Sequence, residues 1–145
     1  MALVLGLNAK LYRNTGSYGS PTWDLIPNVM DLALNMDAGE ATASNRGSTW
    51  ELTVATLKKA SLEFKQVWDP ADLDVTTLLG IFTANSTIEM LVLDGLAATT
   101  GSQGLRALMM VTAWNREEPL EGALLAALTM KPTYSANAPA WYTVP

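Results

Sequence analysis

Apolar and polar residues alternate along much of the chain, which is the pattern of β-strands with one face in the core and one in solvent. Between Trp23 and Asp37 the alternation is interrupted by Pro27, which marks a bend or a sheet edge. Its apolar positions are Met30, Leu32, Leu34 and Met36, and its opposite positions are Asp31, Ala33, Asn35 and Asp37. The pattern predicts a half-solvated strand.

Two further alternating segments, Trp50–Ala55 and Leu62–Trp68, follow in the chain. We expect them to form a hairpin that turns near Lys58 and Lys59. Neither Gly nor Asn stands at that turn, so the pattern does not define the register of the two strands.

One helix is predicted, within the sequence WDPADLDVTTLLGIFTANS. Asp69 is a suitable N-cap residue, and Pro70 is suitable for the first helical position. The acidic residues that follow would interact favourably with the positive end of the helix dipole. The helix is expected to end between Ala84 and Ser86. Its buried stripe has the spacing i, i+3, i+4, i+7 and consists of Val75, Leu78, Leu79 and Phe82.

The second half of the chain predicts three more strands. In chain order the expected elements are a strand over Ile88–Val92, a glycine-rich connection over Asp94–Gly104, a strand over Leu105–Asn115, the turn REEP and a strand over Leu120–Lys131. Both faces of the last strand are mostly apolar, so we expect it to be buried on both sides. Three prolines in the C-terminal sequence PTYSANAPAWYTVP predict an extended segment on the surface, outside the sheet.

About seven strands and one helix indicate a mainly β fold, an antiparallel β-sandwich or barrel with one flanking α-helix. The 145 residues are expected to form a single domain, with an extended N-terminal arm at about 1–8 and a C-terminal tail at about 132–145. The first residues lack the basic and long apolar regions of a signal peptide, so we expect Met1, or a residue close to it, to begin the mature chain.

Composition narrows the possible functions. The chain has no Cys and no His, which excludes thiolate nucleophiles, disulfides and histidine bases. We therefore expect no enzyme, no catalytic residue, no cofactor and no metal site. Charged residues make up only 16% of the chain, whereas roughly 25–35% is usual for the surface of a soluble monomer. Part of the surface is expected to contact protein.

Charge and hydropathy bear on possible partners. The net charge of −5 disfavours tight binding of nucleic acid. It suits a wall past which a polyanion moves without sticking. The longest apolar run, within Ala123–Leu128, is too short to span a membrane, so we expect no membrane insertion.

Two carboxylate clusters have a catalytic or metal-binding interpretation. One would supply an acid and a base for glycoside hydrolysis, although its place beside Pro119 favours a solvated turn. The other would suit Ca²⁺, but it lacks the Gly and distal Glu of an EF-hand loop, and helix capping accounts for it. The first cluster is Glu117, Glu118 and Glu121, and the second is Asp69, Asp72 and Asp74.

Two other features have a ligand-binding interpretation. The glycine-rich stretch DGLAATTGSQG lacks a Gly-Lys-Ser/Thr ending, so a connection between strands is a better interpretation than a phosphate loop. The five tryptophans suggest a stacking platform, but three of them are in phase with strand residues, which favours a core or a subunit interface. They are Trp23, Trp50, Trp68, Trp114 and Trp141.

The twelve-residue polar segment Ala38–Thr49 between two predicted strands is unusual, because connections of this length are mostly functional or disordered. It belongs to a characteristic order of parts: a first strand AKLYRNTG, a Gly/Pro turn, the strand WDLIPNVMDLALNM, the loop GEATASNRGSTWEL, a hairpin, a helix after DPADL, and further strands. In this order the chain resembles, over nearly its whole length, the major tail tube proteins of long-tailed (siphovirus-type) phages and gene transfer agents.

The resemblance implies a structural virion protein that forms stacked hexameric rings, and hence a hollow tail tube through which DNA passes. It implies that one sheet joins its neighbours into an inner barrel and that the long loop reaches an adjacent subunit or ring. Within that loop Glu40 and Arg46 are candidates for polar contacts between subunits, or are simply solvated. The loop residues singled out are Asp37, Gly39, Glu40, Arg46 and Trp50. The candidates to face the lumen, which would otherwise face outward, are Asp31, Asn35, Glu51 and Thr53.

The expected partners are further copies of the chain, together with tape-measure, terminator and distal tail proteins, and DNA in transient, non-specific passage. The expected location is the virion tail, after assembly in the bacterial host cytoplasm. Two alternatives stay open: a tail terminator or connector that forms a single ring, and a monomeric, lipocalin-like ligand-binding β-barrel with tryptophans at its mouth.

Overall fold

The computed structural model describes residues 3–145. Its strands are β1 (Lys10–Asn14), β2 (Trp23–Leu25), β3 (Val29–Thr42), β4 (Thr53–Val67), β5 (Ile88–Leu93), β6 (Gln103–Glu117), β7 (Leu125–Pro132) and β8 (Ala140–Thr143). A single α-helix, α1 (Leu73–Thr83), and a short 3-10 turn, η1 (Gly6–Asn8), complete the described residues. Of the N-terminal arm expected at about 1–8, residues 3–8 are exposed and residues 1–2 lie outside the described part.

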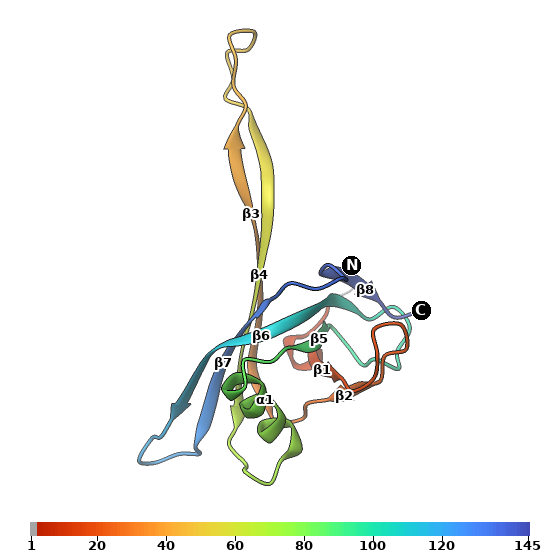
Figure 1. Cartoon of the computed structure of the whole chain (residues 1–145), viewed down its shortest axis with the longest axis vertical. Helices are drawn as coiled ribbons and strands as arrows, with labels where there is room; N and C mark the ends of the chain where they lie inside the picture. Colours follow the sequence, from red (N-terminus) through yellow and green to blue (C-terminus); the bar gives the residue numbers. More distant parts are fainter. Residues whose placement is uncertain (1–2) are drawn as a thin grey trace.

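All eight strands belong to one antiparallel sheet with the order β2-β1-β5-β6-β7-β4-β3, and β8 pairs with β6 beside this path (Figure 1). A mainly antiparallel β fold with one flanking helix is therefore confirmed. The eighth strand lies in the C-terminal tail, where we expected no strand: Gln103–Arg106 of β6 pair with Ala140–Thr143. The prolines stand outside β8, so its backbone N–H groups are free to pair.

Two apolar clusters lie on opposite faces of β5. Met90 and Val92 belong to the larger cluster, whereas Leu91 and Leu93 belong to the smaller one. All six residues of β5 are buried. The prediction that the last strand is buried on both sides is thus wrong: β7 begins at Leu125 instead of Leu120, and only every second residue of its apolar part is fully buried. Double burial requires cover on both faces, which the tertiary structure provides at β5.

Helix α1 begins three residues later than expected. Its N-cap is Asp72, whose side chain accepts a hydrogen bond from the backbone N–H of Asp74. Asp69 instead accepts from the N–H of Ala71 in the turn before the helix, with 3.0 Å between the two atoms. The predicted stripe is confirmed at Val75 and Leu78, which are buried in the core, but it is wrong at Phe82, which is 37% exposed, and Leu79 is only half-buried. No helix among residues 3–145 is long and apolar enough to cross a membrane.

The hairpin expected near Lys58 and Lys59 does not exist, because β4 continues without a turn from Thr53 to Val67. Lys59 lies directly opposite Asp37 of β3, and Lys58 lies opposite Ala38. The two lysines interrupt the apolar pattern because this part of β4 is exposed on both faces, so charged side chains cost little there. The connection between the predicted strands is accordingly shorter than expected, since β3 extends to Thr42 and only residues 43–52 remain outside the strands.

Candidate assembly surfaces

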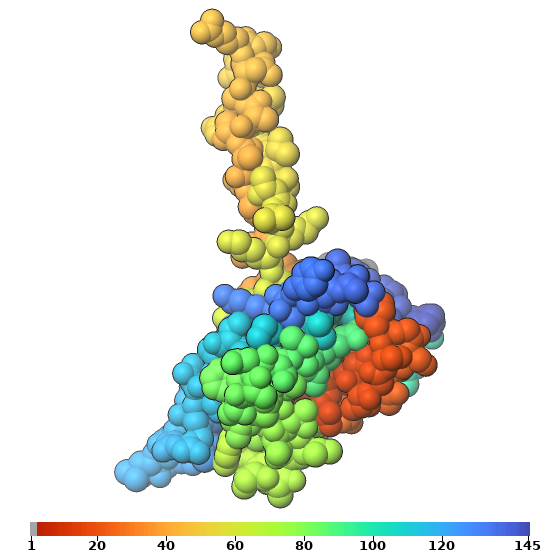
Figure 2. All heavy atoms as spheres, in the orientation of Figure 1, coloured from red at the N-terminus to blue at the C-terminus, as the bar shows by residue number. Residues whose placement is uncertain are grey.

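The outer parts of β3 and β4 form a two-stranded arm that projects far from the body (Figures 1 and 2). β7 pairs with β4 only over Leu62–Val67, so among residues 3–145 the parts of β3 and β4 beyond that point pair only with each other. From residue 35 to residue 59 every residue is exposed except Gly39 and Ser48, which are half-buried. A two-stranded ribbon is at best marginally stable alone in water, so the arm is a surface that a further contact would stabilise.

The arm carries large apolar side chains that touch no core. Leu57 is 82% exposed, Trp50 79%, and Met36 and Val54 are each 52% exposed. Apolar groups gathered in this way mark contact surfaces for protein, and tryptophan is among the residues that contribute most to such contacts. Sequence patterns did not identify Met36, Val54 and Leu57 as contact residues, because their alternation is the same as that of a strand over a core.

Polar side chains order the tip of the arm. The backbone N–H of Ala43 donates to the carbonyl of Leu52 at 2.9 Å, which closes the loop. Within it, the Asn45 side chain accepts from the N–H of Gly47 at 2.8 Å, and the Ser48 hydroxyl accepts from the N–H of Trp50 at 3.1 Å. The small and polar residues of this segment therefore shape a defined loop.

A bulge divides the arm at Gly39. Ala38 pairs with Lys58 and Glu40 with Ala55, so one residue of β3 opposes two of β4. A Cβ atom at Gly39 would lie 2.4 Å from the Thr56 hydroxyl, so a larger residue there would require the Thr56 side chain to move. Bulges increase the local twist of a ribbon, so this one determines the direction in which the tip points.

The body contributes a four-stranded sheet with two open edges, made of β3, β4, β7 and the second half of β6. β5 pairs with β6 only up to Met109, so residues 110–117 have a free edge on that side. The other free edge is β3. Because neighbouring strands are antiparallel, the two edge strands run in opposite directions, and β6 of one copy can pair in antiparallel fashion with β3 of another.

One face of this four-stranded sheet packs on the core and α1, and the other is open. On the core side Leu62, Phe64 and Leu128 are each at most 2% exposed. We name the opposite side the exposed face. By register it consists of Met30, Ala33, Asn35, Asp37, Lys59, Ser61, Glu63, Lys65, Val67, Met110, Ala113, Asn115, Glu117, Leu125, Ala127, Thr129 and Lys131, none of which is fully buried.

The structure brings the predicted loop residues together but separates the predicted lumen residues. Asp37, Gly39 and Glu40 lie on the arm in β3, and Arg46 and Trp50 lie in its tip. Of the lumen candidates, Asn35 is on the exposed face and Asp31 is a bulge residue near the start of β3, with a φ angle of 46°. The other two, Glu51 and Thr53, lie at the far end of the arm. Thr53 pairs with Thr42, which is roughly 24 Å from Asn35 along β3 at 3.4 Å per residue.

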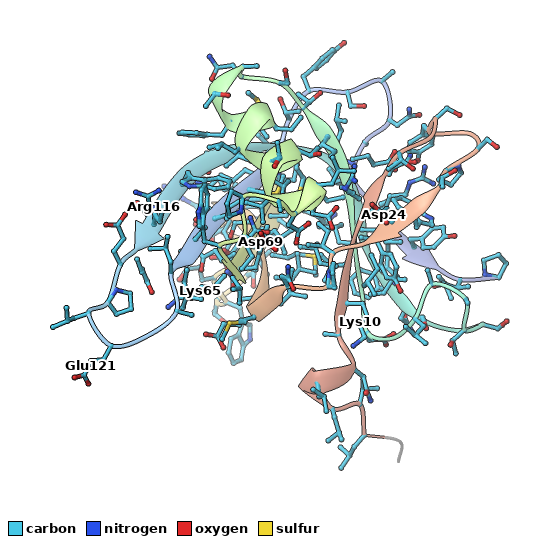
Figure 3. The ribbon with its side chains drawn as sticks, turned by 90° about the horizontal axis from the view of Figure 1, so that it is seen from below. Lys10, Asp24, Lys65, Asp69, Arg116 and Glu121 are labelled. Atoms are coloured by element: carbon cyan, nitrogen blue, oxygen red, sulfur yellow. The ribbon has the colours of Figure 1, made fainter. Side chains whose placement is uncertain are left out.

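Carboxylates of both predicted clusters form ion pairs with arginine side chains of the same chain. Asp74 is buried, and its Oδ1 lies 2.6 Å from Nε of Arg13. In the β6–β7 loop Glu118 pairs with Arg116 at 2.5 Å, and Figure 3 shows Glu121 at the outer end of this loop. Residues 3–145 contain no group of three or more acidic side chains that could hold a metal ion.

The charged and polar side chains that line the cavity beside β1 form hydrogen bonds within the protein. It has a volume of about 340 Å³ and is lined by Asn14, Glu89 and Arg106 among others. Arg106 donates to Glu89 and to the carbonyl of Tyr18, and Asn14 donates to the other oxygen of Glu89. These groups therefore tie the first strand to the sheet.

The tryptophans divide between core and surface. Trp68 and Trp114 pack edge to face, with ring centroids 6.3 Å apart, against the larger apolar cluster. Trp23 packs against the smaller cluster, with its ring 6.1 Å from that of Tyr142. Trp50 and Trp141 are exposed, so five tryptophans do not form a common stacking platform.

Comparisons with known proteins identify solved structures that have a similar fold. No family model matches the chain, and no curated protein matches it. A chain from the tail of an empty gene transfer agent particle, solved with helical refinement and C6 symmetry, is similar at a TM-score of 0.71 and 16% identity over 97% of this chain and 98% of that one.

Two further solved structures agree with it. A chain of the virion of a native gene transfer agent matches at a TM-score of 0.70 and 17% identity, over 96% of this chain and 98% of that one. The SPP1 tail tube matches at a TM-score of 0.73 and 10% identity, over 89% of this chain and 75% of that one. The chain therefore has the fold of tail and tail-tube subunits, as the resemblance predicted.

Proposed function

We propose that this chain is a structural subunit of a tail tube, in which copies join edge to edge into hexameric rings and the rings stack into a hollow cylinder that passes DNA. The observation that carries the proposal is the combination of a four-stranded sheet, open at two complementary edges, with an arm that packs on no other element in the described part of its own copy. Sixfold symmetry is taken from the similar gene transfer agent tail.

The edges account for the ring. When β6 of each copy pairs with β3 of the next, the same contact repeats around an axis. Such head-to-tail contacts form a closed ring when a whole number of copies completes one full turn. Six copies would place their four-stranded sheets in one antiparallel barrel with no unpaired edge. Closure removes the exposed edges that otherwise favour aggregation.

The arm accounts for the stacking. It extends beyond the body in which the sheet lies, so in a ring it reaches a neighbouring subunit or the next ring (Figure 2). Trp50 and Leu57 are its most exposed large apolar side chains and would be its main apolar contacts. Gly39, Glu40 and Arg46 complete the contact as shape-determining and polar residues, whereas Asp37 lies at the base of the arm, opposite Lys59. Glu51 and Thr53 belong to the arm contact rather than to the barrel.

The role is structural and non-enzymatic, and its place is the virion tail, assembled in the bacterial host cytoplasm. Tape-measure, terminator and distal tail proteins are the further partners expected inside and at the ends of such a tube.

Electron microscopy of the purified chain, with sedimentation velocity at several concentrations, tests the proposal. We expect long hollow cylinders. Isolated rings at all concentrations would indicate the terminator or connector alternative, and a concentration-independent monomer would indicate the ligand-binding barrel and overturn the proposal.

An arm variant tests the stacking role. Replacing residues 39–57 by Asn-Gly, which favours a two-residue hairpin turn, should leave a folded subunit that forms rings but no long cylinders. The matched variant Trp50→Ala keeps the full arm and should shorten the cylinders at equal concentration. Cylinders of normal length from the shortened arm would show that stacking does not use it.

A further inference from the structure

The charges on the exposed face of the four-stranded sheet are balanced, unlike those of the whole chain. The face carries three lysines and three carboxylates, whereas the chain has 9 basic and 14 acidic residues. The acidic excess therefore lies elsewhere on the molecule. The six charged residues are Lys59, Lys65, Lys131, Asp37, Glu63 and Glu117.

The charges also alternate in sign along the strands. Residues directly opposite one another in neighbouring strands form rows across the sheet, and successive rows on one face are two residues apart. In order toward the arm, the rows carry Glu117, Lys65, Glu63, Lys131 and finally the pair Asp37 and Lys59.

Each lysine has a carboxylate within reach. Nζ of Lys65 lies 3.4 Å from Oε1 of Glu117, and both side chains are partly exposed. Lys59 is directly opposite Asp37. Lys131 is two residues along β7 from Thr129, the partner of Glu63, which makes Lys131 and Glu63 diagonal neighbours.

The spacing of the rows determines how strongly these charges act at a distance. Two residues along a strand span about 7 Å, which is less than the Debye length of about 8 Å at physiological ionic strength. The fields of adjacent rows of opposite sign therefore overlap and cancel within a short distance of the wall.

The uncharged positions of the exposed face add no affinity for nucleic acid. They are small, amide, hydroxyl, aliphatic or methionine side chains, and the face has neither arginine nor an aromatic side chain. Arginine would bind phosphates in a bidentate manner, and aromatic rings would stack on bases. Figure 3 shows Lys65 at the same end of the molecule as Arg116, but Arg116 shares its register row with the buried Ala126 and so belongs to the core side.

We propose that this exposed face lines the channel and that its rows of opposite charge cancel, so that the wall is nearly neutral toward the DNA that passes it. The proposal rests on the proposed tube function. It differs from the acidic lumen that the net charge of −5 suggests. DNA would then slide because the wall offers no charge cluster of one sign and no specific contact, rather than because the wall repels it.

The absence of cysteine allows a direct test on assembled tubes. Asn35→Cys places a thiol on the exposed face. Gly80→Cys places one on α1, where a Cβ has no atom within 4 Å. In tubes, a maleimide carrying a long polyethylene glycol should modify Gly80→Cys but not Asn35→Cys, while a small maleimide should modify both. Modification of Asn35→Cys by the bulky reagent in intact tubes would overturn the assignment of this face to the channel.

The charge of the channel wall can be measured by comparing how fast Asn35→Cys tubes react with a small cationic and a small anionic thiol reagent. Relative to a free thiol in solution, the cation-to-anion rate ratio should change by less than about threefold, whereas a channel lined by one sign of charge concentrates counter-ions about tenfold or more. A ratio of tenfold or more in favour of the cation would overturn the proposal and support an acidic lumen.

Charge variants of the same thiol tube complete the test. Replacing Lys59, Lys65 and Lys131 by Gln should shift the ratio at least about tenfold toward the cation. The control exchange Lys65→Glu with Glu117→Lys preserves the balance and should leave the ratio unchanged. If the triple variant does not assemble, Glu63→Gln with Glu117→Gln should shift the ratio toward the anion, and no shift would overturn the proposal. Failure of the unmodified chain to form tubes would instead overturn the proposed function, and this assignment with it.

Discussion

Among the glycines, Gly104 in β6 is the one where an added Cβ atom would make the shortest contact. A Cβ atom there would lie 1.5 Å from the carbonyl oxygen of Val92 and 2.6 Å from its carbonyl carbon. Both atoms belong to the backbone of β5, so no side-chain rotation can relieve the contact. To reach ordinary van der Waals separation, β6 would have to move away from β5 by about 2 Å. Gly104→Ala should therefore separate β5 and β6, which both contribute residues to the larger apolar cluster.

The cost of this change can be bounded. Overpacking a well-packed core costs about 1–3 kcal/mol when side chains can adjust. Here backbone must move, so we expect a loss at or above about 3 kcal/mol, which is a large fraction of a typical folding free energy of about 5–15 kcal/mol. Gly80→Ala is the matched control, since a Cβ there meets nothing within 4 Å and Gly80 lies inside a helix. It should stabilise the chain by up to about 1 kcal/mol.

Urea unfolding followed by tryptophan fluorescence measures both variants, at concentrations where sedimentation shows a single species. The free energy of unfolding should fall for Gly104→Ala and rise for Gly80→Ala, with similar dependence on urea concentration. An unfolding midpoint for Gly104→Ala equal to that of the unmodified chain would refute the reasoning, because it would show that β5 and β6 are not held at this separation.

Two further predictions use the same assay. Gln66 is 0% exposed, and neither its Oε1 nor its Nε2 has a hydrogen-bond partner within the described residues. Gln66→Met conserves volume and removes these polar atoms, so it should raise the free energy of unfolding by about 1–3 kcal/mol. A decrease would indicate that the amide is hydrogen-bonded in the folded protein. Asp72→Ala removes the N-cap of α1 and should lower the free energy of unfolding by about 1–2 kcal/mol. Asp69→Ala should lower it by less. A larger loss for Asp69→Ala than for Asp72→Ala would indicate that Asp69 is the cap.

Much of the fold could be predicted from local sequence. Alternation of apolar residues located β3 and the second half of β4, and the alternating residues Ile88, Met90 and Val92 located β5. The helix was located by the spacing of Val75 and Leu78, which are both buried. These features depend on residues close together in the chain, so their periodicity reports them directly.

The boundaries of elements depended on contacts that local sequence does not contain. Asp69 and Asp72 are equally good caps by residue type, and Asp72 is the one that also accepts a hydrogen bond from Asn28, 44 residues away. Lys58 and Lys59 suggested a turn because they interrupt the apolar pattern, yet they continue a strand whose partner is the exposed part of β3. C-terminal residues 140–143 form a strand because β6 offers them a free edge.

The sequence by itself determined that the chain is mainly β with one helix, that it lacks Cys and His chemistry, and that a long polar segment, Ala38–Thr49, follows a strand with alternating apolar residues. Only the tertiary structure decided that this segment is the outer half of a long ribbon, which strand edges stay open, and which charges share one face. The physical reason is that side-chain periodicity is local, whereas strand order, register and free edges arise from pairings between residues far apart in the chain.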